Sequence, residues 1–136
     1  MITLCIDVGT SLIKTVAFDD RGTEIALARQ ETVVMRPAPG FSEQDMCSVW
    51  DAVTSTTRAV VRQLTGPVRL ISLTAQGDGC WLIDSDGRPT GPAFGRFAFQ
   101  GFSARPLNPS TRVSARSSYL AFLAGLRGGL AGQYPT

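Results

Sequence analysis

Three apolar segments with the pattern of strands precede the first segment of the sequence that could form a helix. The chain is therefore expected to begin with a β-sheet. Residues 2–7, 12–18 and 23–34 have the pattern of strands and are separated by residues that favour turns. Tight turns join antiparallel strands, so these segments are expected to pair antiparallel. Residues 36–40 contain two prolines, which fix φ and lack an N–H, and are therefore expected to form a loop.

One amphipathic helix is predicted next. Apolar residues recur at intervals of three or four between Met46 and Leu64, and Gly66-Pro67 is expected to end the helix. Trp50 is the largest residue on this stripe and is expected to be its main buried anchor. Glu43-Gln44 is expected to belong to the entry of the helix.

Two further strands are predicted after the helix, over residues 68–74 and 80–83. A helix between strands allows the next strand to return parallel to the first. The expected fold class is therefore α/β with the order β-β-β-α-β-β. This order resembles the opening half of a ribonuclease-H-like domain.

Composition excludes several kinds of site. The 136 residues suffice for one domain with one core. Histidine is absent, which excludes His-based triads, His zinc sites and His general bases. The three cysteines have no CxxC spacing, so neither a disulfide framework nor a Cys-rich metal site is expected. The first residues lack a basic signal-peptide segment, and no apolar run approaches the ~18 residues of a membrane span. A cytoplasmic location with no membrane partner is expected.

Charge divides the chain into two unlike parts. Residues 1–86 hold all 11 acidic residues, whereas residues 87–136 contain six arginines and no acid. Folded surfaces usually mix both signs. We therefore predict a folded part over residues 1–93 and an Arg-rich tail over residues 94–136, irregular or weakly helical over 113–130. No nucleic-acid partner is expected, because the arginines are not interleaved with aromatic residues and no nucleic-acid motif is present.

The first predicted turn suits the terminal phosphates of a nucleotide. Asp7 ends one strand, Gly9-Thr10-Ser11 follows, and Lys14 lies near the start of the next strand. Gly9 lets backbone N–H groups approach phosphate oxygens, and the hydroxyls of Thr10 and Ser11 can donate to them. Lys14 offers a positive charge, and Asp7 can hold hydrated Mg²⁺. An ordinary hairpin with a capping Asp7 and a solvated Lys14 is the alternative.

Several ordered blocks resemble the N-terminal domain of the FGGY family of carbohydrate kinases. The blocks are Cys5 to Ser11, Lys14 to Gly22, Glu43-Gln44-Asp45 with Trp50, Leu73 to Asp84, and Gly87 to Ala93. The first block and Gln76-Gly77-Asp78-Gly79 are most similar to the polyol-kinase branch, in particular to erythritol kinases. The resemblance covers about residues 2–93 and implies a partial actin-like ATPase domain, the N-terminal fragment of a kinase.

The resemblance also implies a function: transfer of a phosphoryl group from ATP, with Mg²⁺, to a hydroxyl of a sugar or polyol. The residues that match the family's cofactor-binding positions are Asp7, Gly9, Thr10, Ser11 and Lys14, with Asp7 holding the metal through water. The residues that match its substrate positions are Gln76, Gly77 and Asp78. For Asp78, an ordinary loop residue is the alternative.

The resemblance stops after Ala93. A Trp-x-x-Asp-x-Arg-like segment is expected there, but the chain continues with Phe94-Gly95-Arg96. We interpret residues 94–136 as out-of-frame or otherwise non-native sequence, with a genuine short variant as the alternative. The resemblance places the catalytic base and the second domain outside this chain, so we predict that it is inactive alone. The alternative functions are a non-catalytic nucleotide- or polyol-binding module and a fragment of another actin-like ATPase.

Overall fold

The computed structural model describes residues 1–76 and 79–95, and the chain divides into two compact units. Counted over the described residues, the larger unit is Met1–Met35 with Cys47–Gly77, and the smaller is Arg36–Met46 with the chain from Asp78 onward. Gly77, Asp78 and the tail from residue 96, with the helix predicted over 113–130, lie outside the described residues. Each unit has a sheet of its own.

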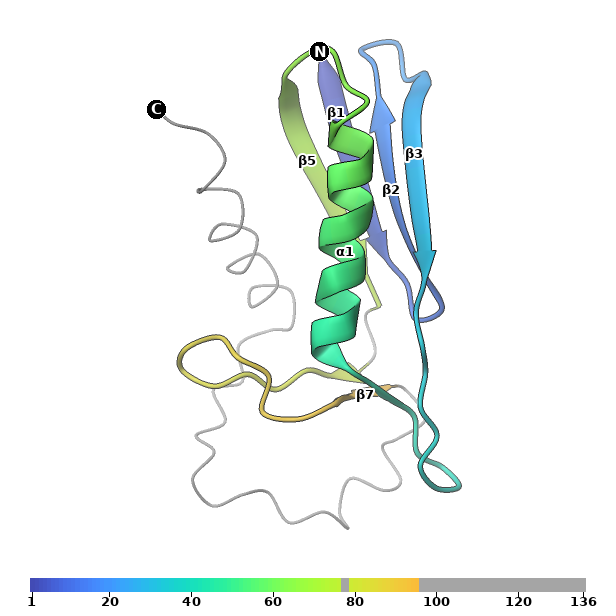
Figure 1. Cartoon of the computed structure of the whole chain (residues 1–136), viewed down its shortest axis with the longest axis vertical. Coiled ribbons are helices and arrows are strands. Elements are labelled where there is room, and N and C mark those ends of the chain that lie inside the picture. The colour runs from blue at the N-terminus through green and yellow to red at the C-terminus, as the bar shows by residue number, and fades with distance from the viewer. Residues whose placement is uncertain (77–78, 96–136) are drawn as a thin grey trace. The chain divides into compact units, whose positions relative to one another are not determined.

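The larger unit is a four-stranded sheet in the order β3-β2-β1-β5, with one helix lying across one face (Figure 1). Its elements are β1 (Ile2–Val8), β2 (Leu12–Phe18), β3 (Glu24–Glu31), α1 (Met46–Val61) and β5 (Val68–Ala75). β2 pairs antiparallel with β1 and with β3, whereas β5 pairs parallel with β1. The antiparallel opening and the parallel return after the helix are thus confirmed.

The third strand is shorter than predicted. It ends at Glu31, although the apolar pattern continued to residue 34. The backbone N–H of Thr32 donates to the carbonyl oxygen of Ser11 at 3.0 Å, and its hydroxyl donates to the carbonyl oxygen of Thr10 at 2.6 Å. The chain after β3 therefore bonds to the turn between β1 and β2.

The core of the larger unit lies between α1 and the face of the sheet that the helix covers. Along β1 every second residue near the centre is buried, which is the period-two pattern of a sheet with one covered face. The largest fully buried side chains are Leu4, Ile6, Ile13, Thr15, Val53 and Val60. The face of the sheet that carries the intervening residues has no helix on it in the described part of the chain.

One polar pair is enclosed in this core. The hydroxyls of Thr15 on β2 and Thr56 on α1 lie 3.0 Å apart. The Thr56 hydroxyl also lies within hydrogen-bond distance of the carbonyl oxygens of Ala52 and Val53, at 2.9 and 3.1 Å. A buried hydroxyl without a partner costs about 1–3 kcal/mol, so this arrangement satisfies both groups and links the helix to β2.

Trp50 is not the buried anchor that the sequence predicted, because its side chain is only half-buried. The buried positions of α1 are Val49, Ala52, Val53, Thr56 and Val60. These residues are small or medium in size, as is the buried Ala17 on the sheet. Small residues let a helix lie close to a sheet, so the buried positions of α1 are held by these residues and not by the bulky Trp50.

The smaller unit contains a three-stranded sheet, β4-β7-β6, which was not predicted. Its strands are β4 (Glu43–Gln44), β6 (Gly79–Cys80) and β7 (Ala93–Gly95). Glu43 and Gln44 are therefore buried strand residues and not part of a helix entry. The strand expected over 80–83 ends at Cys80, and the chain then reverses at Asp84, whose N–H donates to the carbonyl oxygen of Arg88 at 2.8 Å.

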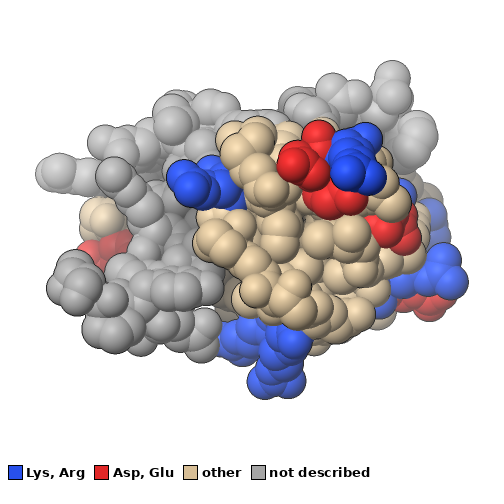
Figure 2. Space-filling model, turned by 90° about the horizontal axis from the view of Figure 1, so that it is seen from above, with Lys and Arg blue, Asp and Glu red and all other residues tan. Residues whose placement is uncertain are grey.

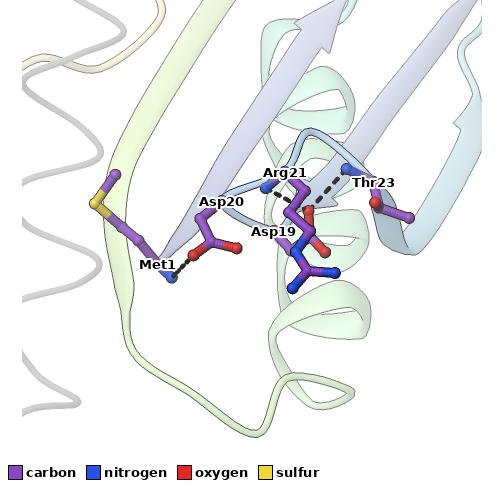
Figure 3. A network of polar contacts seen from close by, with 5 residues as sticks. All are labelled: Met1, Asp19, Asp20, Arg21 and Thr23. Atoms are coloured by element: carbon purple, nitrogen blue, oxygen red, sulfur yellow. Dashed lines mark hydrogen bonds and ion pairs between the residues drawn. The ribbon is translucent and has the colours of Figure 1, made fainter.

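The turn between β2 and β3 is organised by an aspartate. Asp19 Oδ1 accepts hydrogen bonds from the backbone N–H groups of Arg21 and Thr23, both at 2.8 Å (Figure 3). Gly22 follows with a φ of 80°, a conformation that glycine adopts without strain. Asp84 makes the same two contacts with the N–H groups two and four residues after it. One turn design thus occurs twice in the described residues.

Acid is expected to weaken the Asp19 turn. The backbone hydrogen bond from Thr23, followed by the one from Arg21, stabilises the charged carboxylate and lowers the pKa of Asp19 below its ordinary value of 3.8. Such a group stabilises the fold above its unfolded pKa, and this contribution is lost as the pH falls through the folded pKa. We expect Asp19→Asn to lose less stability than the wild type between about pH 5 and pH 2, measured by urea denaturation at each pH.

The control for this prediction is Asp20→Asn, which changes the neighbouring carboxylate but keeps both contacts to Asp19. Asp20 makes a 4.0 Å ion pair with the N-terminal ammonium of Met1, and both groups are exposed, so little stability depends on that pair (Figure 3). An equally steep loss of stability in Asp19→Asn and in the wild type would contradict the prediction.

The surface at the end where the chain begins carries charges of both signs. Figure 2 shows Lys and Arg side chains lying among Asp and Glu side chains, with uncharged residues between them. This end is therefore not a uniformly basic surface. Across residues 1–76 and 79–95, no helix combines the length and the apolar character needed to cross a membrane.

Candidate functional site

A carboxylate and an ammonium group lie opposite each other beside the β1–β2 turn, at the end of the sheet away from the N-terminus (Figure 1). Asp7 on β1 pairs with Lys14 on β2, and both side chains are exposed. Residues opposite each other in an antiparallel pair project from the same face, with Cβ atoms ~4.5–5.5 Å apart. Because Ile6 and Val8 point into the core, Asp7 and Lys14 share the face that α1 does not cover. The sequence prediction grouped these two residues, and the structure brings them together.

Two residues that sequence reasoning missed stand in the same row. Arg29 on β3 pairs with Lys14, and Thr74 on β5 pairs with Asp7. All four side chains are exposed, so the row across the sheet reads Arg29, Lys14, Asp7, Thr74. Like charges directly opposite each other are unfavourable, so the neighbouring cations Arg29 and Lys14 favour an anion at this place. Strand register, which the sequence does not give, was needed to find them.

Gly9 is required by the turn itself. Its N–H donates to the carbonyl oxygen of Leu12 at 3.1 Å. A Cβ atom on Gly9 would lie 2.7 Å from that same oxygen, so any other residue would force the two strands apart. The N–H of Gly9 is thus used within the hairpin.

The two outer strands hold this turn from both sides. After β5, the N–H of Gln76 donates to the carbonyl oxygen of Val8 at 3.2 Å, and the hydroxyl of Thr10 donates to Gln76 Oε1. After β3, Thr32 bonds to the carbonyl oxygens of Thr10 and Ser11. Residues from three parts of the sequence thus meet at Thr10. Thr32 was not predicted, because nothing in its local sequence distinguishes it from other strand-end threonines.

The predicted substrate residues are described only in part. Gln76 follows β5 directly and is half-buried, whereas Gly77 and Asp78 lie outside the described residues. The contact between Thr10 and Gln76 joins a predicted phosphate-binding residue to a predicted substrate-binding residue that lies 66 positions later. Ser11 remains exposed at the tip of the turn.

The residues present fit a magnesium ion held through water. In the described ranges, no group of three or more Cys, Asp or Glu residues is arranged to hold a metal ion. Mg²⁺ usually keeps several waters and is bound through one or two carboxylates together with substrate phosphates. The exposed carboxylate of Asp7 beside Lys14 meets that requirement without a dedicated protein cage.

Comparison with known proteins gives a consistent picture. The model of the FGGY family of carbohydrate kinases, N-terminal domain, matches residues 2–95. A probable L-xylulose kinase from Haemophilus influenzae is 33% identical over 93 residues, which cover 66% of this chain and 19% of that protein. The erythritol kinase of Brucella abortus is 34% identical over 117 residues, covering 84% of this chain and 22% of that protein. The chain thus spans about a fifth of the length of these relatives.

Solved structures agree on the fold. A gluconate kinase from Lactobacillus acidophilus superimposes with a TM-score of 0.65 at 22% identity, over 68% of this chain and 19% of that one. The structural neighbours are sugar kinases of the actin-like ATPase fold, which confirms the predicted fold class. Because the family model matches well over half of the residues, this chain belongs to the FGGY family of carbohydrate kinases.

Proposed function

We propose that this chain supplies the phosphate-binding turn of a kinase that transfers the γ-phosphoryl group of ATP to a hydroxyl of a sugar or polyol. The observation that carries the proposal is the pairing of Asp7 with Lys14 on the open face, beside a turn whose shape is fixed by Gly9. Phosphoryl transfer depends on positioning and on charge stabilisation, and both can be supplied by a rigid strand end with an exposed cation and an exposed carboxylate.

Each residue of the turn has a distinct role in this proposal. The ammonium group of Lys14 neutralises charge on the phosphate oxygens, and Ser11 donates a hydrogen bond from its hydroxyl. Asp7 accepts hydrogen bonds from the water ligands of Mg²⁺. A magnesium ion held there would supply positive charge against the phosphate oxygens. Thr10 and Gly9 give the turn its shape.

The substrate side is assigned to Gln76, Gly77 and Asp78. A carboxylate such as that of Asp78 can accept hydrogen bonds from two neighbouring hydroxyl groups, which suits a polyhydroxylated substrate. The names of the relatives point to the same substrate class, since they include an erythritol kinase, glycerol kinases and L-xylulose kinases. Erythritol is therefore the first substrate to test.

The division of the chain at residues 93 and 94 stays a prediction, as does the interpretation of residues 94–136 as non-native sequence. The family model ends at residue 95, whereas the match to the erythritol kinase of Brucella abortus extends over 117 residues. Part of that longer match therefore falls within the tail.

The proposal is tested by titrating the 136-residue chain with Mg–ATP and following its backbone amide signals by NMR. We expect binding with a Kd on the order of 1 mM, weak because one strand end supplies few contacts, with signals shifting at Thr10, Ser11 and Lys14. Adenosine with Mg²⁺, which lacks the phosphates, is expected to shift none of them. Equal shifts with both ligands, or none with Mg–ATP, would overturn the proposal.

The same preparation tests activity. We expect no ADP production from Mg–ATP and erythritol by the chain alone, because one strand end provides little of the positioning that phosphoryl transfer needs. Erythritol-dependent ADP formation above the rate of the Lys14→Met variant would contradict this expectation and show that the chain is catalytically sufficient.

A further inference from the structure

We infer that Gln76 is a positioning residue, whose side chain grips Thr10 and, together with Thr32, sets the shape of the turn that presents Ser11 and Lys14. The hydrogen bonds that Thr10 makes with Gln76 and Thr32, called the Thr10 grip below, are seen in the structure itself. Its consequence for nucleotide binding rests on the proposed function.

The turn needs support from outside the hairpin. Val8 pairs with Ile13 and the N–H of Gly9 bonds to Leu12, so Thr10 and Ser11 are its two central residues. Two-residue hairpin loops that match the natural twist of strands require a positive φ at one or both central residues. No non-glycine residue in the described ranges has a positive φ, so this turn is neither of the two types, I′ and II′, that favour a two-residue hairpin loop. Contacts from neighbouring segments must hold it.

Gln76 provides the first of these contacts. Its N–H bonds to the carbonyl oxygen of Val8 and so continues the pairing of β1 with β5 beyond Ala75. This fixes the backbone of Gln76 beside the end of β1, from which its side chain reaches the hydroxyl of Thr10. A shorter side chain at this position would not span the same gap.

Thr32 provides the second contact from the opposite side. Its hydroxyl donates to the carbonyl oxygen of Thr10 at 2.6 Å, and its N–H donates to the carbonyl oxygen of Ser11 at 3.0 Å. Thr10 is therefore held through its side chain by the segment after β5 and through its backbone by the segment after β3. Ser11, which directly follows the fixed Thr10, is exposed at the tip of the turn.

Gln76 is itself one of the predicted substrate residues, and its side chain ends at the phosphate-binding turn. A change at Gln76 is therefore expected to reach the nucleotide side even though the residue need not touch ATP.

The grip is tested first without nucleotide, by amide hydrogen exchange in the 136-residue chain. The reporters are the N–H groups of Gly9 and Thr32, which bond within and onto the turn. We expect Gln76→Ala and Thr10→Val to speed their exchange roughly threefold to tenfold, as for loss of one hydrogen bond. Gln76→Glu and Thr10→Ser keep an acceptor and a hydroxyl, respectively, and are expected to retain wild-type exchange.

The internal control is the turn between β2 and β3, where the N–H groups of Asp19 and Gly22 are also hydrogen-bonded. They should exchange at the wild-type rate in every variant. If exchange at Gly9 and Thr32 is unchanged in Gln76→Ala, or rises by the same factor at Asp19 and Gly22, the inference is wrong.

The consequence is tested by titration with Mg–ATP. We expect Gln76→Ala and Thr10→Val to weaken binding roughly threefold to tenfold, with Thr10→Ser restoring it. Equal affinity of Gln76→Ala and the wild type would overturn the link between Gln76 and the phosphates. If the wild type itself does not bind Mg–ATP, the proposed function fails, while the exchange measurement still decides whether the grip exists.

Discussion

Replacement of Lys14 by methionine is expected to lower the affinity for Mg–ATP by about tenfold to a hundredfold, the effect of losing a hydrogen bond to a charged group. Lys14 is exposed and lies opposite Asp7, so its ammonium group is the nearest strand-borne cation to the proposed position of Mg²⁺. Methionine keeps the length and the apolar stem of the side chain but removes the charge. Affinity is measured by NMR titration of both chains under the same salt conditions.

The matched control is Arg69→Met. Arg69 is an exposed cation on β5 of the same sheet, next to Val68 at the start of the strand and therefore at the opposite end from the β1–β2 turn. Its replacement removes the same charge from the chain and is expected to change the affinity less than twofold, because exposed charges more than ~10 Å apart are largely screened at ordinary salt. A similar loss of affinity in Lys14→Met and Arg69→Met would mean that only the net charge of the chain determines Mg–ATP binding. The proposed phosphate site at Lys14 would then be wrong.

Replacement of Ile6 by alanine is expected to destabilise the fold by about 2–5 kcal/mol. Ile6 is 1% exposed and lies on β1, between β2 and β5 and beneath α1. Removing its side chain leaves a cavity in the only large apolar layer of the described chain. Because domains are stable by only ~5–15 kcal/mol, such a loss is a large part of the total. Urea denaturation followed by circular dichroism gives the difference.

Ile25→Ala is the matched control for this second variant. Ile25 has the same side chain on β3 of the same sheet but is 45% exposed. Its replacement is expected to cost much less, because a smaller apolar area leaves the core and no closed cavity forms. Similar losses in Ile6→Ala and Ile25→Ala would contradict the assignment of the core to the face under α1.

Elements with a strong local signal could be predicted from the sequence. The period-two pattern of β1 and β2 and the helical stripe from Met46 onward each depend on neighbouring residues, and both were predicted within a few residues of their ends. β4 and β7 could not be found, because strands of two or three residues have no measurable periodicity and form only through their pairing. Trp50 was misjudged because its size suggested burial, whereas the fit of the helix to the sheet favours smaller residues.

The candidate site divides in the same way. Asp7, Gly9 and Lys14 belong to one continuous motif, so their proximity follows from a single hairpin. Arg29 and Thr74 join them only through strand register, which depends on the whole sheet. The grip on Thr10 depends on Thr32, which follows β3, and on Gln76, which follows β5. Both residues are far from Thr10 in the sequence, so no local sequence pattern predicts their contacts with it.

The order of strands in the larger sheet has a practical consequence for handling the chain. Among the described residues β5 is an outer strand, and its neighbouring residues Leu70 and Ile71 are 55% and 43% exposed on opposite faces. An outer strand offers a free row of backbone donors and acceptors to any extended peptide it meets, including the same strand of another molecule. Samples for spectroscopy are therefore best kept dilute and checked by light scattering before each series.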